Sequence, residues 1–416
     1  MITSDHAAVL PQPEPGLSPA DVVERARALR PLLLEQHEET IERGAYSPEL
    51  HERFRQAGFY RILQPKRFGG YEFDLPTFFR VIMEISAGDP GAGWCLSLAS
   101  AHVLPVASHF SAEAQAEFFG DDGEFAAPHS ATARGTAVPV DGGYIVSGDW
   151  RYSSGIPYST HFLGTAQLVA PDAGEPYPEV VVIVPRGGYT ILDDWGGDLT
   201  LGLQGSGSYT AEIRDLFVPE HHVVPWNWLG GDVDAGTPGT KLHGNPMYLG
   251  QCGALYAGEI GSVMVGAARA AIDEFEHVIR TRKTQFPPIQ PRALDVPTQR
   301  TLGSAIAWTD AAEACLIHAG ETYMDQCQTW LDTGVAPTPA ETLRLATTIQ
   351  TAMRLCWETE YLLFTSAGSS VTRRGERTLK YFKDLAMAQP QRAEAFNMMT
   401  ERVAQMVLGI ADEDHE

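Results

Sequence analysis

The sequence has little positive charge and lacks the paired cysteines of a disulfide or zinc framework. Across 416 residues, 30 Lys and Arg stand against 53 Asp and Glu, a formal net charge of −23 at pH 7. This field repels phosphates, so nucleic acid and anionic membranes are excluded as partners. The five cysteines are widely spaced and never form C-x-x-C, which favours a reducing compartment and predicts no metal site.

Long apolar runs and a signal peptide are also missing. No stretch of about 18 apolar residues occurs, and the N-terminus, MITSDHAAVLPQPEPGLSPA, is acidic and proline-rich rather than basic and then apolar. This pattern predicts a cytoplasmic protein. We expect residues 1–17 to be a flexible N-terminus.

The first part of the chain has helical periodicity. Ser18-Pro19-Ala20-Asp21 resembles a capping box with proline at the first helical position, and the apolar spacing behind it predicts one amphipathic helix over 18–43. Further helices are expected at 47–58, 77–86, 91–102 and 112–119. Residues 18–123 therefore predict an N-terminal helical domain.

The pattern changes near Glu124 to short β-prone runs separated by turns. Strands are expected at 142–152, 160–169, 179–192 and 208–219, forming an antiparallel, barrel-like central β domain over 124–230. Helical periodicity then returns at 250–286, 298–333, 340–367 and 391–410, which predicts a C-terminal four-helix bundle over 231–416. The fold class is α+β.

This order of domains resembles the acyl-CoA dehydrogenase fold, and several motifs are more specific. They are LQPKRFGGYEFD (63–74), GDPGAGWCLSLASAH (88–102), VDGGYIVSGDWRYSSG (140–155), GLQGSGSYTAEIRDLFVPEHHV (202–223) and LKYFKD (379–384). Together they resemble the flavin-dependent monooxygenases built on that fold, the oxygenase components of two-component systems such as the 4-hydroxyphenylacetate and seco-steroid phenol hydroxylases. The resemblance extends from Phe54 to Asn397.

The resemblance implies reduced FMN or FAD as cofactor and O2 as co-substrate, with a C4a-hydroperoxyflavin as the oxygenating species. The sequence lacks the Gly-rich strand-to-helix unit of a nucleotide-binding fold, so a separate NAD(P)H:flavin reductase is expected to supply the reduced flavin. Trp150, Ser153, Ser154 and Gly155 would line the flavin, with one serine hydroxyl at flavin N5. The alternative is a strand end whose serines bond the backbone.

The resemblance also implies a phosphate site and an assembly. Arg282, followed by Phe286, would hold the flavin phosphate of a neighbouring subunit in a homotetramer, and the loop containing Ser366, Gly368 and Ser369 would cradle its tail. The alternatives are a solvated basic helix end and a simple glycine cap.

Two histidines are candidates for the substrate site. By the resemblance, His102 would contact the substrate hydroxyl and help to deprotonate a phenol, while His129 and Ser130 would line the same pocket. A structural histidine is the alternative reading of His102. The substrate is a small to polycyclic organic molecule, expected to be aromatic.

One departure leaves other functions open. Phenol hydroxylases carry a histidine where this chain has Ala386, so N-oxygenation of an amine on the same fold is an alternative. An acyl-CoA dehydrogenase would need a carboxylate base, but its usual position falls near Arg392, with Glu394 nearby and Glu259 as another candidate. A flavin-free binding protein is the third class.

Overall fold

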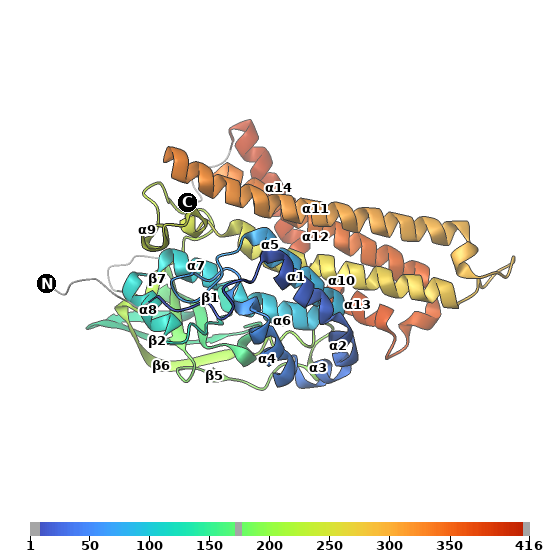
Figure 1. Ribbon diagram of the computed structural model, residues 1–416, viewed down its shortest axis with the longest axis horizontal. Coiled ribbons are helices and arrows are strands. Elements are labelled where there is room, and N and C mark those ends of the chain that lie inside the picture. Colours follow the sequence, from blue (N-terminus) through green and yellow to red (C-terminus); the bar gives the residue numbers. More distant parts are fainter. Residues whose placement is uncertain (1–8, 171–176, 411–416) are drawn as a thin grey trace.

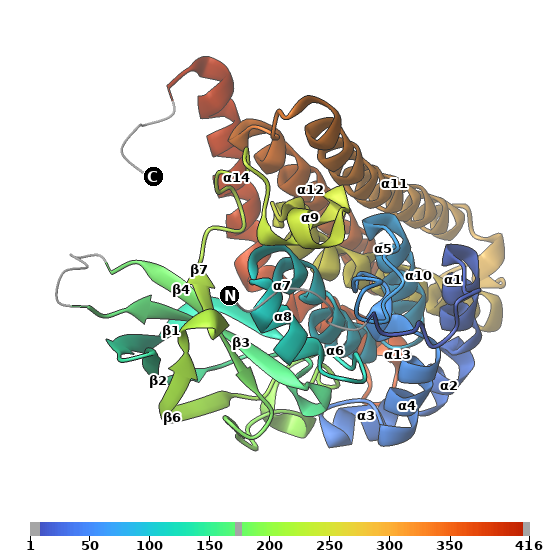
Figure 2. The same ribbon diagram turned by 60° about the vertical axis from the view of Figure 1, so that its left-hand side comes forward.

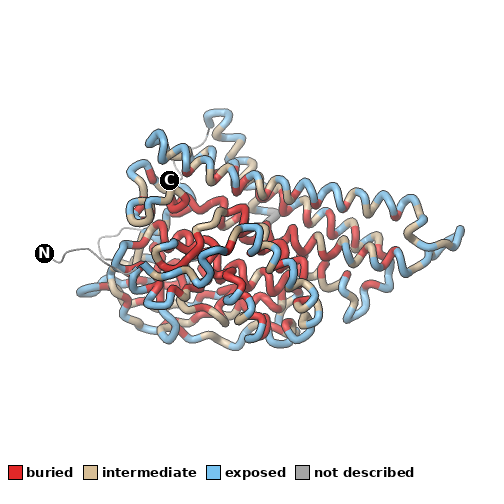
Figure 3. The backbone as a smooth tube through the Cα atoms, in the orientation of Figure 1, coloured by how far each residue is buried: buried red, intermediate tan, exposed pale blue. Residues whose placement is uncertain are grey.

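The computed structural model describes residues 9–170 and 177–410, without the side chains of 391–393. Its three regions meet around a shared core, with long helices extending beyond the sheet on one side (Figure 1). The buried backbone concentrates where the regions meet, and the far ends of the long helices are more exposed (Figure 3). The predicted order of a helical region, a sheet and a helical bundle is confirmed.

The N-terminal region is helical, as expected. Its helices are α1 (Pro19–Ala28), α2 (Arg30–Glu35), α3 (His37–Arg43), α4 (Pro48–Gln56), α5 (Leu75–Gly88), α6 (Pro90–Ser100), α7 (Val103–His109) and α8 (Ala112–Phe119), with the 3-10 turn η1 (Phe59–Arg61). The capping box at Ser18 is present, with Asp21 as its partner. The single helix expected over 18–43 is wrong, because the chain breaks at Leu29 and again at Gln36. The first break comes just before Pro31, which cannot donate a helical hydrogen bond.

The end of the segment expected to be flexible makes defined contacts in the part that the structure describes. The amide of Leu10 donates to the carbonyl of Arg67 at 2.9 Å, and Leu17 is buried. Residues 1–8 lie outside the described residues. The described segment is therefore anchored along the N-terminal helices.

The central domain is one seven-stranded sheet in the order β5-β6-β2-β1-β3-β4-β7. The strands are β1 (His129–Val140), β2 (Gly143–Trp150), β3 (His161–Leu168), β4 (Glu179–Pro185), β5 (Thr190–Ile191), β6 (Ala211–Pro219) and β7 (Val223–Pro225), with turns η2 (Ile156–Tyr158), η3 (Gly197–Leu199) and η4 (Glu220–His222). The purely antiparallel expectation is wrong for one pair, since β1 and β3 are parallel. The reason is that residues 151–160 cross the end of β1 and deliver β3 to its other side, so this segment cannot remain a strand.

The C-terminal region is the expected helical bundle. It contains α9 (Pro238–His243), η5 (Pro246–Leu249), α10 (Gly253–Thr281), η6 (Arg292–Leu294), α11 (Val296–Thr333), α12 (Pro339–Ala367), η7 (Ser369–Thr372), α13 (Arg377–Met387) and α14 (Gln389–Leu408). Helices α10, α11 and α12 run side by side, whereas α14 turns away from them (Figures 1 and 2). None of the described helices combines the length and apolar character needed to span a membrane.

The glycine-rich stretch 202–207 joins the regions. A Cβ at Gly202 would lie 2.2 Å from the Lys383 carbonyl oxygen, and the amide of Leu203 donates to Asp384 at 2.7 Å. The stretch leads into β6 and not into a helix, which confirms that it is not a dinucleotide fingerprint. It is a close crossing between the β domain and α13.

Candidate active site

A buried acid–histidine pair lies where the three regions meet. His102 is the N-cap residue immediately before α7, and Glu259 lies on α10. Nε2 of the histidine is 3.3 Å from Oε2 of the carboxylate. Nδ1 of His102 lies 3.0 Å from the carbonyl oxygen of Ala127. Because a carbonyl only accepts, Nδ1 carries a proton, and Nε2 is the ring nitrogen that faces the carboxyl group.

A second histidine stands against the first. The rings of His102 and His129 are perpendicular, with centroids 5.7 Å apart. His129 hydrogen-bonds the Tyr256 hydroxyl at 2.6 Å and the Thr165 hydroxyl at 3.0 Å. Burial, and next the neighbouring His102, hold the pKa of His129 well below its ordinary value, so the ring is neutral. It accepts from one hydroxyl and donates to the other.

The structure therefore brings together residues that the sequence predicted for the substrate. Ser130 follows His129 at the start of β1, and both are buried. Trp226, which packs edge-on against His129, is only half-buried, as is Tyr256. Sequence reasoning missed Tyr256 and Trp226, because no local motif shows that α10 and the segment after β7 meet over β1.

The two serines after the predicted flavin strand have different hydrogen-bond partners. The hydroxyl of Ser153 donates to the Trp150 carbonyl oxygen at 3.0 Å and is fully buried in the turn. The hydroxyl of Ser154 instead accepts from the Trp94 indole at 3.0 Å and lies 2.6 Å from the Ser208 hydroxyl, which in turn bonds Ser206. Ser154 thus belongs to an extended polar row beside the half-buried Trp94.

Two other predicted flavin contacts need correction. The Trp150 indole lies in the core of the sheet, where it donates to the Thr165 carbonyl at 2.8 Å. A Cβ on Gly135 would lie 2.3 Å from this ring, so the glycine is there to admit it. Gly155, at φ 89°, packs its backbone against α6, where a Cβ would meet the Cys95 carbonyl at 2.6 Å. The Trp150 indole and Gly155 serve packing in this conformation.

Some of the residues predicted to bind the flavin phosphate lie close together. Arg282 hydrogen-bonds the Ser370 hydroxyl and forms an ion pair with Glu376 at 3.1 Å. Arg292, which sequence reasoning missed, donates to the carbonyl oxygens of Ala367 and Ser366. Burial, and next the neighbouring Arg282, lower its pKa.

The predicted loop residues lie beside these arginines, whereas Phe286 does not. Gly368 and Ser369 are exposed on the loop that the arginines contact. Phe286 is 75% exposed, so the structure leaves it outside the cluster. Two cations therefore stand beside a loop with exposed amides, an arrangement suited to an anion.

The alternative catalytic carboxylates are placed as well. Glu394 is exposed on α14, the side chain of Arg392 lies outside the described residues, and Glu259 is engaged with His102. Ala386 is half-buried on α13. Neither Glu394 nor Ala386 belongs to the His102–Glu259 pair.

Comparison with known proteins identifies the family. Residues 22–120 match the model for the acyl-CoA dehydrogenase N-terminal domain, and residues 259–392 match the model for its C-terminal domain. A pigment production hydroxylase from a Rhodococcus species is 33% identical over 304 residues, covering 71% of this chain and 74% of the relative. The HsaA oxygenase subunit of a flavin-dependent monooxygenase from Rhodococcus jostii is 30% identical over 251 residues, covering 60% of this chain and 63% of the relative's length.

Solved structures agree with this placement. A 3-HSA hydroxylase from Rhodococcus superposes with a TM-score of 0.84 at 25% identity, covering 95% of this chain and 98% of the other. XiaF from Streptomyces, solved with FADH2 and glycerol, gives the same TM-score of 0.84 and 25% identity, covering 94% of this chain and 96% of the other. The chain belongs to the flavin-dependent monooxygenases of the acyl-CoA dehydrogenase fold.

Proposed function

We propose that this chain is the oxygenase component of a two-component monooxygenase that hydroxylates a phenolic aromatic substrate with reduced FMN or FAD. The observation that carries the proposal is the buried His102–Glu259 pair, which can take a proton from a phenol. Relatives support it: one is named as an FADH2-dependent resorcinol hydroxylase oxygenase component and another as a p-hydroxyphenylacetate 3-hydroxylase oxygenase component.

The hydrogen bonds of Ser154 leave an acceptor that fits the N5–H of a reduced flavin. If Ser154 donates to Ser208 and accepts from Trp94, its oxygen keeps one lone pair. The N5–H of a reduced flavin is a donor that would satisfy it. A cavity of about 350 Å³ lies beside this row. Its wall contains Ser208 and the aromatic side chains Tyr152 and Trp195, together with charged side chains: Asp149, Arg151, Asp194 and Glu212.

When bound, a reduced flavin supplied by a separate NAD(P)H:flavin reductase would provide two electrons and activate O2 as a C4a-hydroperoxide, so that one oxygen atom would enter the substrate and the other would leave as water. His102 takes the phenol proton, which makes the ring carbon more nucleophilic. Exclusion of water by the buried surroundings suppresses loss of H2O2.

The phosphate cluster is proposed to serve a neighbouring subunit. Glu259 and Thr281 are separated by 22 residues of the continuous helix α10, which is about 33 Å at 1.5 Å per residue. Arg282 and Arg292 thus lie far from their own chain's His102 and Ser154. In a homotetramer, the same cluster would hold the phosphate of a flavin bound mainly by the next chain.

The experiment compares the two serines. Photoreduced FMN or FAD is added anaerobically, O2 is mixed in, and the near-ultraviolet absorbance of the hydroperoxide is followed. In S154A we expect decay to oxidised flavin and H2O2 to be at least about tenfold faster, with flavin affinity lowered by about tenfold or less.

The matched control is S153A, whose hydroxyl closes the turn. It should lose about 1 kcal/mol of stability and keep the lifetime of the intermediate. Equal lifetimes in the parent and S154A would overturn the N5 assignment. Failure of any intermediate to form with either flavin would overturn the proposed function itself. A product screen with phenols and amines separates C-hydroxylation from N-oxygenation.

A further inference from the structure

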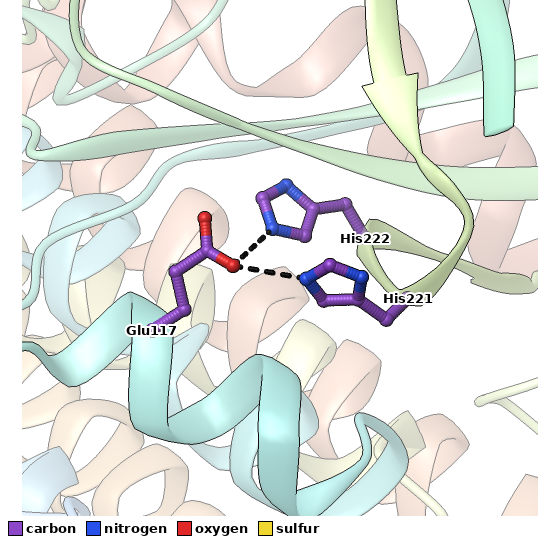
Figure 4. A group of neighbouring side chains, drawn as sticks. All are labelled: Glu117, His221 and His222. Carbon is purple, nitrogen blue, oxygen red and sulfur yellow. Dashed lines mark hydrogen bonds and ion pairs between the residues drawn. The ribbon is translucent and has the colours of Figure 1, made fainter. Parts of the chain in front are cut away.

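A group of two histidines and a glutamate lies outside the proposed active site. Glu117 is on α8, and His221 and His222 form the end of η4 between β6 and β7. The two ring nitrogens point toward one carboxylate oxygen from adjacent positions of the chain (Figure 4). Two segments that are distant in sequence thus present three metal-binding side chains to one point.

The distances suit a small divalent cation. Oε2 of Glu117 lies 2.9 Å from Nε2 of His221 and 3.1 Å from Nε2 of His222, and the three ligand atoms all lie within 4.8 Å of one another. Tetrahedral zinc with bonds of about 2.0–2.1 Å needs its ligands roughly 3.3 Å apart. Small rotations of these side chains would therefore open the site to the required size.

The hydrogen bonds within this group do not satisfy all of its buried polar atoms. Nε2 of His222 is buried and makes no hydrogen bond of suitable geometry to any described residue, although it lies 3.1 Å from Oε2 of Glu117. Both rings compete for a single carboxylate oxygen. A cation at the centre would bind all three ligand atoms at once, and the net charge of −23 favours its approach.

We propose that Glu117, His221 and His222 bind a zinc-class divalent cation. Two imidazole nitrogens and one carboxylate oxygen form a borderline donor set that favours Zn²⁺ over Mg²⁺. The fourth position remains for water. The site is independent of the flavin chemistry.

The position of the site suggests what the cation does. It ties α8 of the N-terminal region to the end of β6, immediately before β7 and Trp226. His222 already packs edge-on against Phe118 with ring centroids 4.8 Å apart. Because Trp226 and Trp228 pack against His129, a bound cation would brace the segment that covers this histidine.

The test is titration of the chelator-treated full-length chain with ZnCl2 by calorimetry, followed by thermal unfolding. We expect one Zn²⁺ per chain, a higher Tm with Zn²⁺, and no saturable binding of MgCl2 at the same concentration. H221Q should weaken Zn²⁺ binding by more than about 100-fold and abolish the Tm shift, since one of three protein ligands is lost.

The control is H318Q, which changes an exposed histidine on α11 and should bind Zn²⁺ like the parent. H221Q is chosen because His221 is only half-buried, and E117Q, at an exposed position, provides a second variant that should fold. No saturable Zn²⁺ binding by the parent would overturn the proposal. Binding left unchanged in both variants would overturn it as well, because the metal would then lie elsewhere.

Discussion

Nε2 of His102 lies 3.3 Å from Oε2 of Glu259, with both side chains buried at the junction of α6–α7 and α10. The carbonyl of Ala127 fixes the other ring nitrogen as a donor. The carboxylate that a dehydrogenase would have used as its base is thus coupled to a histidine. Under the proposed function, the two groups act together in proton transfer.

The first prediction concerns this unit. H102Q should lower kcat for a phenol that the parent hydroxylates by about 10²–10⁴-fold, because general-base assistance is lost. E259Q should lower kcat by a smaller factor. The double variant H102Q/E259Q should be no worse than H102Q, since the two residues are proposed to act in the same proton transfer. Stopped-flow product formation measures this, H277Q at an exposed position serves as control, and full activity in H102Q would contradict the assignment.

The second prediction concerns assembly. Large apolar side chains are exposed on the C-terminal region, including Phe286 at 75%, Val335 at 65% and Tyr361 at 53%, which favours association. We expect sedimentation to show a homotetramer of the 45.3 kDa chain. R282A should leave the tetramer intact and weaken reduced-flavin binding by about tenfold, or about 1.4 kcal/mol. A stable monomer at micromolar concentration would contradict both the tetramer and the shared phosphate site.

The third prediction is a loss of stability on acidification. Burial lowers the pKa of His109, His161 and His243 to about 4, and that of His129 well below its ordinary value. The unfolded chain binds protons below about pH 6.5 that the folded chain refuses. The free energy of unfolding should therefore fall as the pH drops from 6.5 toward 4, by up to about 1.4 kcal/mol per pH unit for each histidine.

Urea unfolding between pH 7.5 and 5 measures this slope. His161 packs against the rings of Phe118 and Phe125, so H161F should fold and reduce the slope by about one proton. H318Q, at an exposed position, should leave the slope unchanged. A slope that is identical in H161F and the parent would show that His161 titrates normally.

The fourth prediction concerns a buried carboxyl group on α12. Neither oxygen of Glu360 has a hydrogen-bond partner among the described residues, and burial, followed by the nearby Asp384, raises its pKa well above the ordinary value. The folded chain keeps this proton after the unfolded chain has lost it. Stability should therefore fall as the pH rises above about 4.5, by up to about 1.4 kcal/mol per pH unit.

E360Q should remove that part of the pH dependence and be more stable than the parent at pH 8, because the amide cannot ionise. Denaturant unfolding at pH 5 and pH 8 tests it, with E358Q at an exposed position as the control. Lys380, 2.7 Å from Asp384 and 3.2 Å from Asp89, stays charged in both proteins. If the free energies of unfolding of the parent and E360Q differ by the same amount at both pH values, the proposed titration of Glu360 is refuted.

The sequence by itself determined the order of the regions and the family. Apolar periodicity and caps such as Ser18 act within a few residues, so most long helices could be predicted. Strand β1 was missed because HSATARGTAVPV contains three alanines, one glycine and one proline, which are residue types depleted in strands. Helix α13 was missed as well, because its stability depends on packing against α10 and α12.

Only the tertiary structure decided which side chains meet. The sequence could not predict that Ser153 and Ser154 have different hydrogen-bond partners. The partners of Ser154 are Trp94 and Ser208, which are distant from it in the sequence. Nor could it pair His102 with Glu259 or Glu117 with the two histidines after β6, because each contact joins elements that are distant in the sequence. Local spacing governs helices and turns, whereas a proton pair or a ligand set depends on contacts that only the folded chain provides.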